Sequence, residues 1–378
     1  MDLTLICPGL FGPIALTSPG LAPTPALDRL LSRADGTATG PRDPLETLAG
    51  AFGLLPPPGA DLPSAALCLL ADAPDLAQSG FWFHADPVHL RPDRDRLLLF
   101  GGPALGVHED EAAALAKSFN AHFGADGLVL AAPRPDRWYL RVPGRPDLRT
   151  RPLYAVAGGP VEGLLPTGSD ARLWARWQTE TQMLFHAHPV NAVREDTGRP
   201  TLGGLWVWGG GALPRVPGGP DLVIAEHPLA LGLARAAGVR AEKGSDPFSR
   251  HALLPPAVLA LEKGSKKGSD PFIVVFWDAL WWPALEGDGA SWQEGVRILE
   301  TGALWLISAL ETGLIRSLTI DDGSSVRFLV TGGALRRFWR RRGRFSDWLD
   351  RLRQTRPGAA DGARDWPPRS SLRAAPPH

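Results

Sequence analysis

Cysteine, lysine and long apolar runs are scarce in this chain of 378 residues. Its two cysteines, Cys7 and Cys68, are too few for a disulfide framework or a cysteine zinc site. Both lie in apolar runs, LTLIC and ALCLL, which favours buried thiols. No apolar run reaches the roughly 18 residues that a membrane span needs, and the N-terminus MDLTLICPGL has an acid where a signal peptide carries positive charge. We therefore expect a cytoplasmic protein with no membrane partner.

Net charge and familiar catalytic motifs are also absent. Lys and Arg number 40, as do Asp and Glu, so no overall field attracts nucleic acid or an anionic membrane. The sequence contains no P-loop, no G-x-G-x-x-G after a strand, no G-x-S-x-G and no H-E-x-x-H. Because 44% of the residues are hydrophobic, the chain is typical of globular proteins and long enough for two domains.

What the sequence does contain is an alternation of short apolar strands with amphipathic helices. Continuous apolar strands that alternate with helices predict an α/β fold with a mostly parallel sheet covered by helices. The predicted strands are 3–7, 96–100, 136–142, 221–225, 272–280 and 315–323. The predicted helices are 24–35, 109–124, 170–188, 229–238 and 291–313.

A repeated hexapeptide interrupts this alternation. KGSDPF occurs at 243–248 and again at 267–272, and four of the chain's five lysines lie in the same stretch. Two copies cannot build a solenoid, so we interpret 242–271 as a surface insertion, which a fold tolerates at small entropic cost. The end of the chain, 353–378, is rich in Pro, Arg, Ala and Ser and is predicted to be disordered.

A cluster of three polar residues follows the helix predicted at 170–188. His188, Asn191 and Arg194 are spaced three apart, which on a helical turn places an imidazole, an amide and a guanidinium on one face. Such a set suits a phosphate or a carboxylate, because Arg offers a planar fork and the other two add directed hydrogen bonds. The alternative is a helix terminus at which these residues cap the backbone and complement the dipole.

Acids and histidines at two places have metal-ligand chemistry. His84 and Asp86 lie in FHADPVHL, while Asp278 and the pair Asp321–Asp322 end predicted strands. Ligands of parallel sheets bind beyond the carboxyl ends of the strands, where a two-metal enzyme would keep its carboxylates. The alternatives are a hydrogen-bonded loop for the first group and helix or turn capping for the second.

Arginine is concentrated near the C-terminus, in ALRRFWRRRGRF. Arg336, Arg337, Arg340 and Arg341, interleaved with aromatic residues, would suit contacts with RNA or DNA. An amphipathic helix with a solvated charged face is the favoured alternative.

The order of these pieces resembles archaeal-type cofactor-independent phosphoglycerate mutases of the alkaline phosphatase superfamily. The matching segments are HPVNAVR followed by GLWVWGG, and the early helix TPALDRLL. The resemblance implies a discontinuous α/β core at 1–79 and 196–352 and a smaller inserted α+β domain at 80–195. It also implies that GLWVWGGG, 204–211, is a strand and turn with which the chain re-enters the core.

The sequence departs from that family at its metal site. The family places Asp-Gly after the first strand, where this chain has Cys7-Pro8-Gly9, and Asp-His where it has Asp321–Asp322. WDALWWPALEGDG contains no histidine, and Ser64 is the one serine in the region of the nucleophile. Two divalent ions would lose much of their ligand set, which removes the support for phosphoryl transfer.

A closer match is the group of bacterial proteins called RpfE-type regulatory proteins, which the chain resembles over nearly its whole length. We therefore predict a catalytically inactive, mutase-derived regulatory protein that needs no cofactor and binds a small phosphorylated or carboxylated metabolite. The first alternative is an active phosphoglycerate mutase-like phosphotransferase with two divalent metal ions such as Mn on a rearranged site. The second is a regulator that contacts nucleic acid, and the sequence identifies no protein partner.

Overall fold

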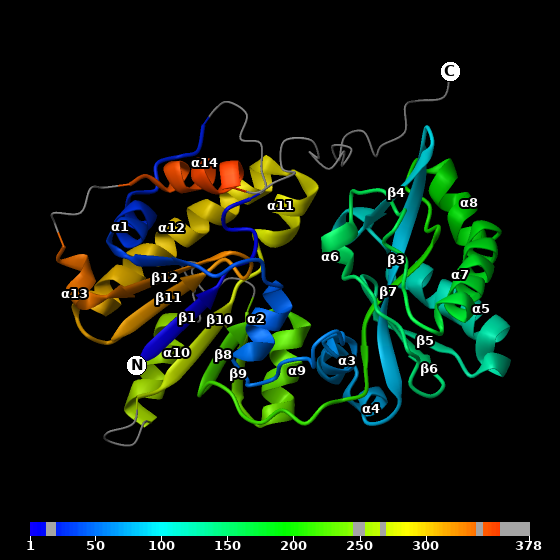
Figure 1. The fold of residues 1–378 in the computed structure, drawn as a ribbon, viewed down its shortest axis with the longest axis horizontal. Coiled ribbons are helices and arrows are strands. Elements are labelled where there is room, and N and C mark those ends of the chain that lie inside the picture. The colour runs from blue at the N-terminus through cyan, green and yellow to red at the C-terminus, as the bar shows by residue number, and fades with distance from the viewer. Residues whose placement is uncertain (13–19, 245–253, 265–269, 338–342, 356–378) are drawn as a thin grey trace. The chain divides into compact units, whose positions relative to one another are not determined.

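The computed structural model describes residues 1–12, 20–244, 254–264, 270–337 and 343–355. The chain forms two compact units, shown in Figure 1. Within the described residues, unit 1 holds Met1–Leu55 and the chain from Arg215 onward, and unit 2 holds Pro56–Pro214. The units divide the chain at other points than the predicted 79/80 and 195/196, because the helix at 64–72 and the strand at 204–211 pack with the sheet of unit 2.

Unit 1 is built on a seven-stranded sheet with strand order β2-β12-β11-β1-β10-β8-β9. Neighbouring strands from β11 to β9 run parallel, and β12 and β2 are antiparallel additions at one edge. The mostly parallel α/β sheet predicted from the apolar strands is thus confirmed. The strands are β1 (Asp2–Ile6), β2 (Asp35–Ala38), β8 (Leu222–Ala225), β9 (Arg240–Lys243), β10 (Phe272–Phe276), β11 (Ser317–Asp321) and β12 (Val326–Thr331).

Helices cover both faces of this sheet. On one face, strand residues such as Leu5, Val275 and Leu318 share a buried cluster with Leu30 of α1 and Val296 of α12. On the other face α9 packs on β8 and α2 packs on α9. The helices of unit 1 are α1 (Pro25–Arg33), α2 (Pro44–Gly50), α9 (Pro228–Ala237), α10 (Leu254–Gly264), α11 (Trp281–Glu286), α12 (Gly289–Glu311), α13 (Gly332–Leu335) and α14 (Phe345–Thr355).

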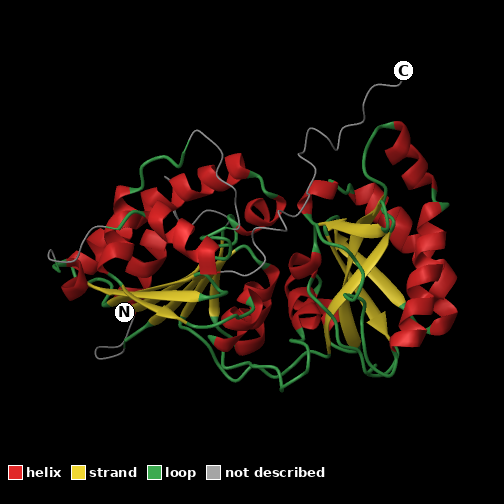
Figure 2. Cartoon of the chain, turned by 45° about the horizontal axis from the view of Figure 1, so that its top comes forward, coloured by secondary structure: helices red, strands yellow, loops and turns green. Residues whose placement is uncertain are grey.

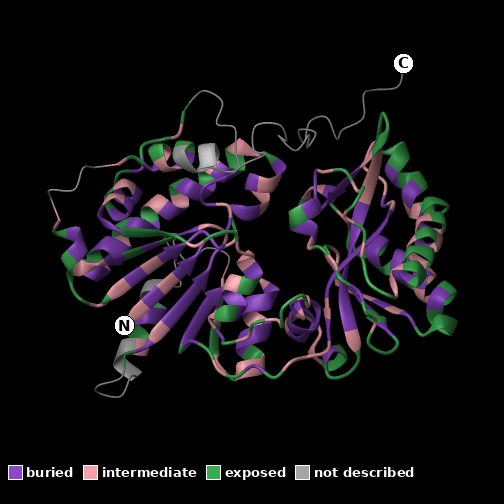
Figure 3. Ribbon diagram, viewed as in Figure 1, coloured by how far each residue is buried: buried purple, intermediate pink, exposed green. Residues whose placement is uncertain are grey.

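Unit 2 contains a five-stranded antiparallel sheet. Its long strand β3 pairs with β4, β6 and β7. Helices lie along this sheet in Figure 2, and Figure 3 shows that buried residues concentrate on its strands. Phe83 of the sheet packs with Phe119 of α5 and Phe185 of α7 in one core. The strands are β3 (Phe81–Asp93), β4 (Arg96–Gly101), β5 (Val129–Arg134), β6 (Arg137–Val142) and β7 (Gly204–Gly211). The helices are α3 (Ser64–Asp72), α4 (Pro74–Ala77), α5 (Glu109–Phe123), α6 (Leu153–Val156), α7 (Ala171–His186) and α8 (Pro189–Asp196).

The segment GLWVWGGG is strand β7 and belongs to unit 2. It pairs with β3, with Trp208 opposite His84 and Trp206 opposite Asp86. The expectation that it re-enters the main core is therefore wrong, because its hydrogen-bonding edge is taken by β3. Its first glycine after the tryptophans, Gly209, has φ +63°, and a Cβ there would lie 2.2 Å from the hydroxyl of Ser64. Only glycine fits this close approach of β7 to α3.

The range predicted as a surface insertion, 242–271, contains the end of β9 and the helix α10. Ala257 and Val258 of α10 are buried in the core of unit 1, so this part of the range packs as a structural element. Residues 245–253 and 265–269 lie outside the described residues, as does the predicted disordered tail from 356 onward. Residues 353–355 form the last turn of α14.

Candidate functional site

His188 is the residue that precedes helix α8 and caps its N-terminus. Its Nδ1 accepts a hydrogen bond from the backbone N–H of Val190 at 3.2 Å, and its Nε2 lies 3.0 Å from the hydroxyl of Ser118 on α5. Burial lowers the pKa of His188, so the ring is neutral at pH 7. Both ring nitrogens thus hold α8 in place.

Asn191 and Arg194 are buried and fasten α8 to the segment that enters β7. The amide of Asn191 donates to the carbonyl of Phe185 at 2.8 Å and exchanges two hydrogen bonds with Leu202. Arg194 donates to Glu111 at 2.6 Å and to the carbonyls of Pro200 and Leu105, with no exposed side-chain surface. These contacts correspond to the structural alternative for the cluster, and its ligand-binding role stays a prediction.

His84 and Asp86, two of the predicted metal ligands, lie on one face of β3 against Trp208. The His84 ring stacks on the indole at 3.9 Å, and Asp86 accepts a hydrogen bond from the indole N–H at 2.6 Å. Burial is the main cause that raises the pKa of Asp86 to about 7. These residues belong to unit 2, whereas Asp278, Asp321 and Asp322 belong to unit 1.

Asp322 ties the β11–β12 hairpin. Its carboxylate accepts hydrogen bonds from the backbone N–H groups of Ser324, Ser325 and Val326 and from both serine hydroxyls, at 2.7 to 2.9 Å. This is the turn-capping alternative of the sequence analysis. Asp322 is buried, so the bonds are shielded from water.

Cys7 and Asp278 follow β1 and β10 and lie near each other. Burial, with Asp278 and Asp322 as further causes, raises the pKa of the Cys7 thiol well above its ordinary value. The thiol is therefore protonated at neutral pH. Across the described residues, no group of three or more His, Cys, Asp or Glu side chains is arranged to hold a metal ion.

Asp321 is the centre of a different arrangement, because it binds two arginines. Its carboxylate is buried and accepts from Nη2 of Arg42 at 2.8 Å, Nη1 of Arg42 at 3.3 Å and Nε of Arg327 at 2.9 Å. The backbone N–H of Gly323 donates to it as well, at 2.8 Å. One carboxylate thus carries two guanidinium groups.

Local structure explains why these three side chains meet. Asp321 and Arg327 are directly opposed on the antiparallel strands β11 and β12. Arg42 precedes α2, and its backbone N–H donates to the carbonyl of Ser324 at 2.7 Å, which holds it beside the hairpin turn. Its Nε donates to the hydroxyl of Thr39 at 2.9 Å, which fixes the orientation of the guanidinium.

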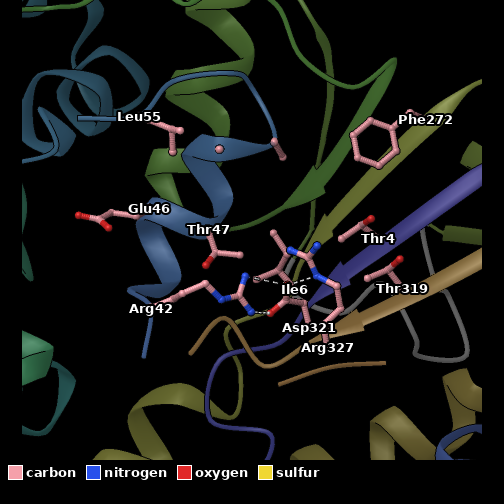
Figure 4. Close-up of a pocket in the computed structure, with 12 residues that line it drawn as sticks. Thr4, Ile6, Arg42, Glu46, Thr47, Leu55, Phe272, Thr319, Asp321 and Arg327 are labelled. Carbon is pink, nitrogen blue, oxygen red and sulfur yellow. Dashed lines mark hydrogen bonds and ion pairs between the residues drawn. The ribbon is translucent and has the colours of Figure 1, made fainter. Parts of the chain in front are cut away.

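A pocket of about 460 Å³ opens beside this group, on the sheet face between α2 and the strands β1, β10, β11 and β12. Figure 4 shows the Arg42–Asp321–Arg327 group on one side of the pocket and the ring of Phe272 on another. The lining residues are Thr4, Ile6, Arg42, Glu46, Thr47, Gly50, Ala51, Leu55, Phe272, Thr319, Asp321 and Arg327.

Several donors that line the pocket remain available. Arg327 is half exposed, and among the described residues no acceptor is bonded to its two terminal nitrogens. The hydroxyls of Thr4 and Thr319 make no hydrogen bond to any residue that the structure describes. These two threonines are register partners on β1 and β11. The Arg42–Asp321–Arg327 group by itself has one more positive than negative charge, which favours an anion at that end of the pocket, although the four charged lining residues together sum to zero. Glu46, on the exposed rim, is the opposing charge.

The sequence analysis identified Asp321 but missed both arginines. Arg327 follows Asp321 by six residues across the turn DDGSS, so a predicted hairpin would have placed the two residues opposite each other. No comparable signal marks Arg42, which reaches the group through the backbone contacts of a distant segment.

Of the arginines proposed to contact nucleic acid, Arg336 and Arg337 directly follow helix α13. Arg337 pairs with Asp35 at 3.0 Å. Arg340 and Arg341 lie outside the described residues. The described helices include none that is both long and apolar enough to span a bilayer.

Comparison with known proteins supports a relationship to one enzyme family. No protein-family model matches the chain. The 2,3-bisphosphoglycerate-independent phosphoglycerate mutase of Methanothrix thermoacetophila is 32% identical over 100 residues, 25% of this chain and 26% of that protein. The enzyme of the same name from Methanosarcina mazei is 27% identical over 94 residues, 23% of this chain and 24% of its own length. The chain thus matches about a quarter of the length of these curated relatives.

Among solved structures, the PH0037 protein from Pyrococcus horikoshii superposes with a TM-score of 0.52. The superposition covers 88% of this chain and 87% of the other, at 18% identity. An identity this low speaks for the fold alone. The chain therefore shares an α/β fold with the PH0037 protein and is similar in sequence, over about a quarter of its length, to 2,3-bisphosphoglycerate-independent phosphoglycerate mutases.

Proposed function

We propose that this mutase-like protein binds a small phosphorylated or carboxylated metabolite at the Arg42–Asp321–Arg327 group, without metal-dependent turnover. The observation that supports the proposal most strongly is the pair of guanidiniums held on one buried carboxylate beside a pocket. Because these arginine side chains are already ordered, ligand binding costs less side-chain conformational entropy. An oxyanion would accept hydrogen bonds from the terminal N–H groups of Arg327 that Asp321 does not use.

The residues at the strand ends do not fit the two divalent ions of an active mutase. Guanidiniums already neutralise Asp321, five protein donors occupy Asp322, and the Cys7 thiol has a raised pKa. A divalent cation beside Asp321 would be repelled by Arg42 and Arg327. This chemistry supports binding over phosphoryl transfer.

The site differs from the cluster at His188, Asn191 and Arg194 that the sequence suggested for the same ligand class. That cluster donates its hydrogen bonds to its own unit, whereas Arg327 keeps terminal donors available toward a pocket. Binding without turnover would suit the regulatory role implied by the resemblance to RpfE-type proteins, and that role is part of this proposal.

Titration calorimetry at low ionic strength tests the binding site. We expect inorganic phosphate and 3-phosphoglycerate to bind the full chain, and Arg327→Gln to weaken both about tenfold, the loss of roughly one charge-assisted contact. Arg297→Gln, at an exposed pair with Glu294 on α12, is the matched control and should change nothing. Equal affinities for wild type and Arg327→Gln would refute the site.

Metal content and turnover distinguish binding from catalysis. After incubation with manganese and desalting, we expect no stoichiometric manganese by elemental analysis and no conversion of 3-phosphoglycerate by the same sample. About two bound ions together with turnover would establish the alternative, an active enzyme with a rearranged metal site.

A further inference from the structure

The pocket beside Asp321 has chemically different ends. The two arginines lie at the C-terminal end of β11. Phe272 is the first residue of β10, so it lies at the opposite end of the strands. Phe272 is in register with Asp2, and Asp321 with Ile6, so the two positions are four residues apart along the strands. At about 3.3 Å per residue in a parallel sheet, the offset along the strands is about 13 Å, and because β1 lies between β10 and β11 the two positions are also about 10 Å apart across the sheet.

The end at Phe272 is suited to a planar apolar group. The aromatic ring of Phe272 and the side chain of Leu55 both line it, and Leu55 is 70% exposed. Figure 4 shows the ring of Phe272 and Leu55 across the upper part of the pocket from each other. A large apolar side chain left this exposed gains from being covered, and an aromatic ring offers a stacking partner.

Hydroxyl groups lie between the two ends. Thr4 and Thr319, opposite each other on β1 and β11, stand between Phe272 and Arg327 in Figure 4. Their side chains can donate and accept hydrogen bonds, which suits a sugar. The order of groups along the pocket is therefore cation pair, hydroxyl pair and aromatic ring.

We infer that the ligand of this pocket is a nucleoside monophosphate, with its phosphate at Arg42 and Arg327, its ribose at Thr4 and Thr319, and its base at Phe272 and Leu55. This inference rests on the proposed function, since both use the same arginines. The ends are about 13 Å apart along the strands, which is farther than a small phosphorylated acid would span and leaves room for a sugar and a base between the phosphate and the aromatic ring. Phe272 is also the last residue of the second KGSDPF copy, so the repeated element would supply one wall of the site.

The test is a ligand series titrated into the full chain: inorganic phosphate, ribose 5-phosphate and adenosine 5′-monophosphate. We expect the affinity to rise along the series, with the base adding about tenfold or more, as base–aromatic stacking does elsewhere. Phe272→Leu should reduce the affinity for the monophosphate to that for ribose 5-phosphate and leave inorganic phosphate unchanged. Phe81→Leu, a partly buried phenylalanine of unit 2, is the matched control.

The outcomes separate this inference from the proposed function. If phosphate binds but the base adds nothing, the nucleotide assignment is overturned while the anion site stands. If phosphate does not bind at all, both fall. Because the ligand series needs no variant, the result does not depend on whether Phe272→Leu folds, and Thr319→Val supplies a second variant that should weaken ribose 5-phosphate more than phosphate.

Discussion

Asp321 shows how one buried carboxylate can change the chemistry of a strand end. With two arginines on it, the end of β11 carries a group with one more positive than negative charge, which favours an anion over a cation. Asp321 stabilises the fold by satisfying these donors and the N–H of Gly323. Its role is that of a positioning residue, since it would hold the groups that touch the ligand.

Replacing this carboxylate should cost stability as well as binding. We expect Asp321→Asn to lower the free energy of unfolding by about 2 kcal/mol, because charge-assisted hydrogen bonds are lost from a buried acceptor. Denaturant unfolding measures the effect. Glu294→Gln, at an exposed pair, is the comparison and should leave stability unchanged, and an equally small effect of Asp321→Asn would contradict the structure of the group.

Asp86 makes stability depend on pH. Its pKa is about 7 when folded and near 3.8 when unfolded, so only the unfolded chain ionises it as pH rises from 4 to 7. Its contribution to the free energy of unfolding therefore falls over this interval and is lowest above pH 7. The pKa difference between 3.8 and about 7 corresponds to a loss of at most roughly 4 kcal/mol in the free energy of unfolding.

Asp86→Asn tests this linkage. The variant keeps the shape of the side chain and cannot ionise, so we expect its stability relative to wild type to increase between pH 4.5 and pH 8. Denaturant unfolding at several pH values gives the difference. A constant difference across the range would mean that Asp86 is ionised in the folded chain.

At the scale of elements, the close contact between β7 and α3 depends on Gly209. An alanine at position 209 would have to adopt φ +63°, and its Cβ would lie 2.2 Å from the hydroxyl of Ser64. We therefore expect Gly209→Ala to lower the free energy of unfolding by at least about 2 kcal/mol. Gly106→Ala is the matched control, since Gly106 has φ +54° with nothing within 4 Å of the added carbon. If the two variants lower the melting temperature by the same amount, the close contact with Ser64 does not contribute.

Elements whose pattern is local were predictable from the sequence. The helix expected at 109–124 is α5, Glu109–Phe123, and the apolar run at 272–276 is strand β10, which pairs with β1 and β8 inside the sheet. Strand partners were not predictable: the run 204–211 is apolar on both faces, and nothing in it shows that β3 takes its edge. The site was missed for the same reason, because Arg42 and Arg327 meet only through register and a distant turn.

At the scale of the whole molecule, the chain is two units with separate cores. Among the residues that the structure describes, unit 2 is the continuous segment Pro56–Pro214, which supplies all five strands of its sheet. A continuous segment with its own core and a satisfied sheet can fold independently.

We therefore expect the fragment 56–214 to fold on its own. Its amide NMR spectrum should show dispersed resonances and its unfolding should be cooperative. A fragment that aggregates or gives a collapsed spectrum would show that unit 2 needs unit 1 for its stability.

The central proposal is that the Arg42–Asp321–Arg327 group binds an anion and holds no metal ion. A crystal structure of the chain grown with manganese and then soaked with inorganic phosphate tests the claim most directly. We predict phosphate in hydrogen-bond contact with Nη atoms of Arg42 and Arg327 and no metal on Asp321. Manganese on Asp321 with the arginines displaced, or phosphate bound at His188 and Arg194 instead, would contradict it.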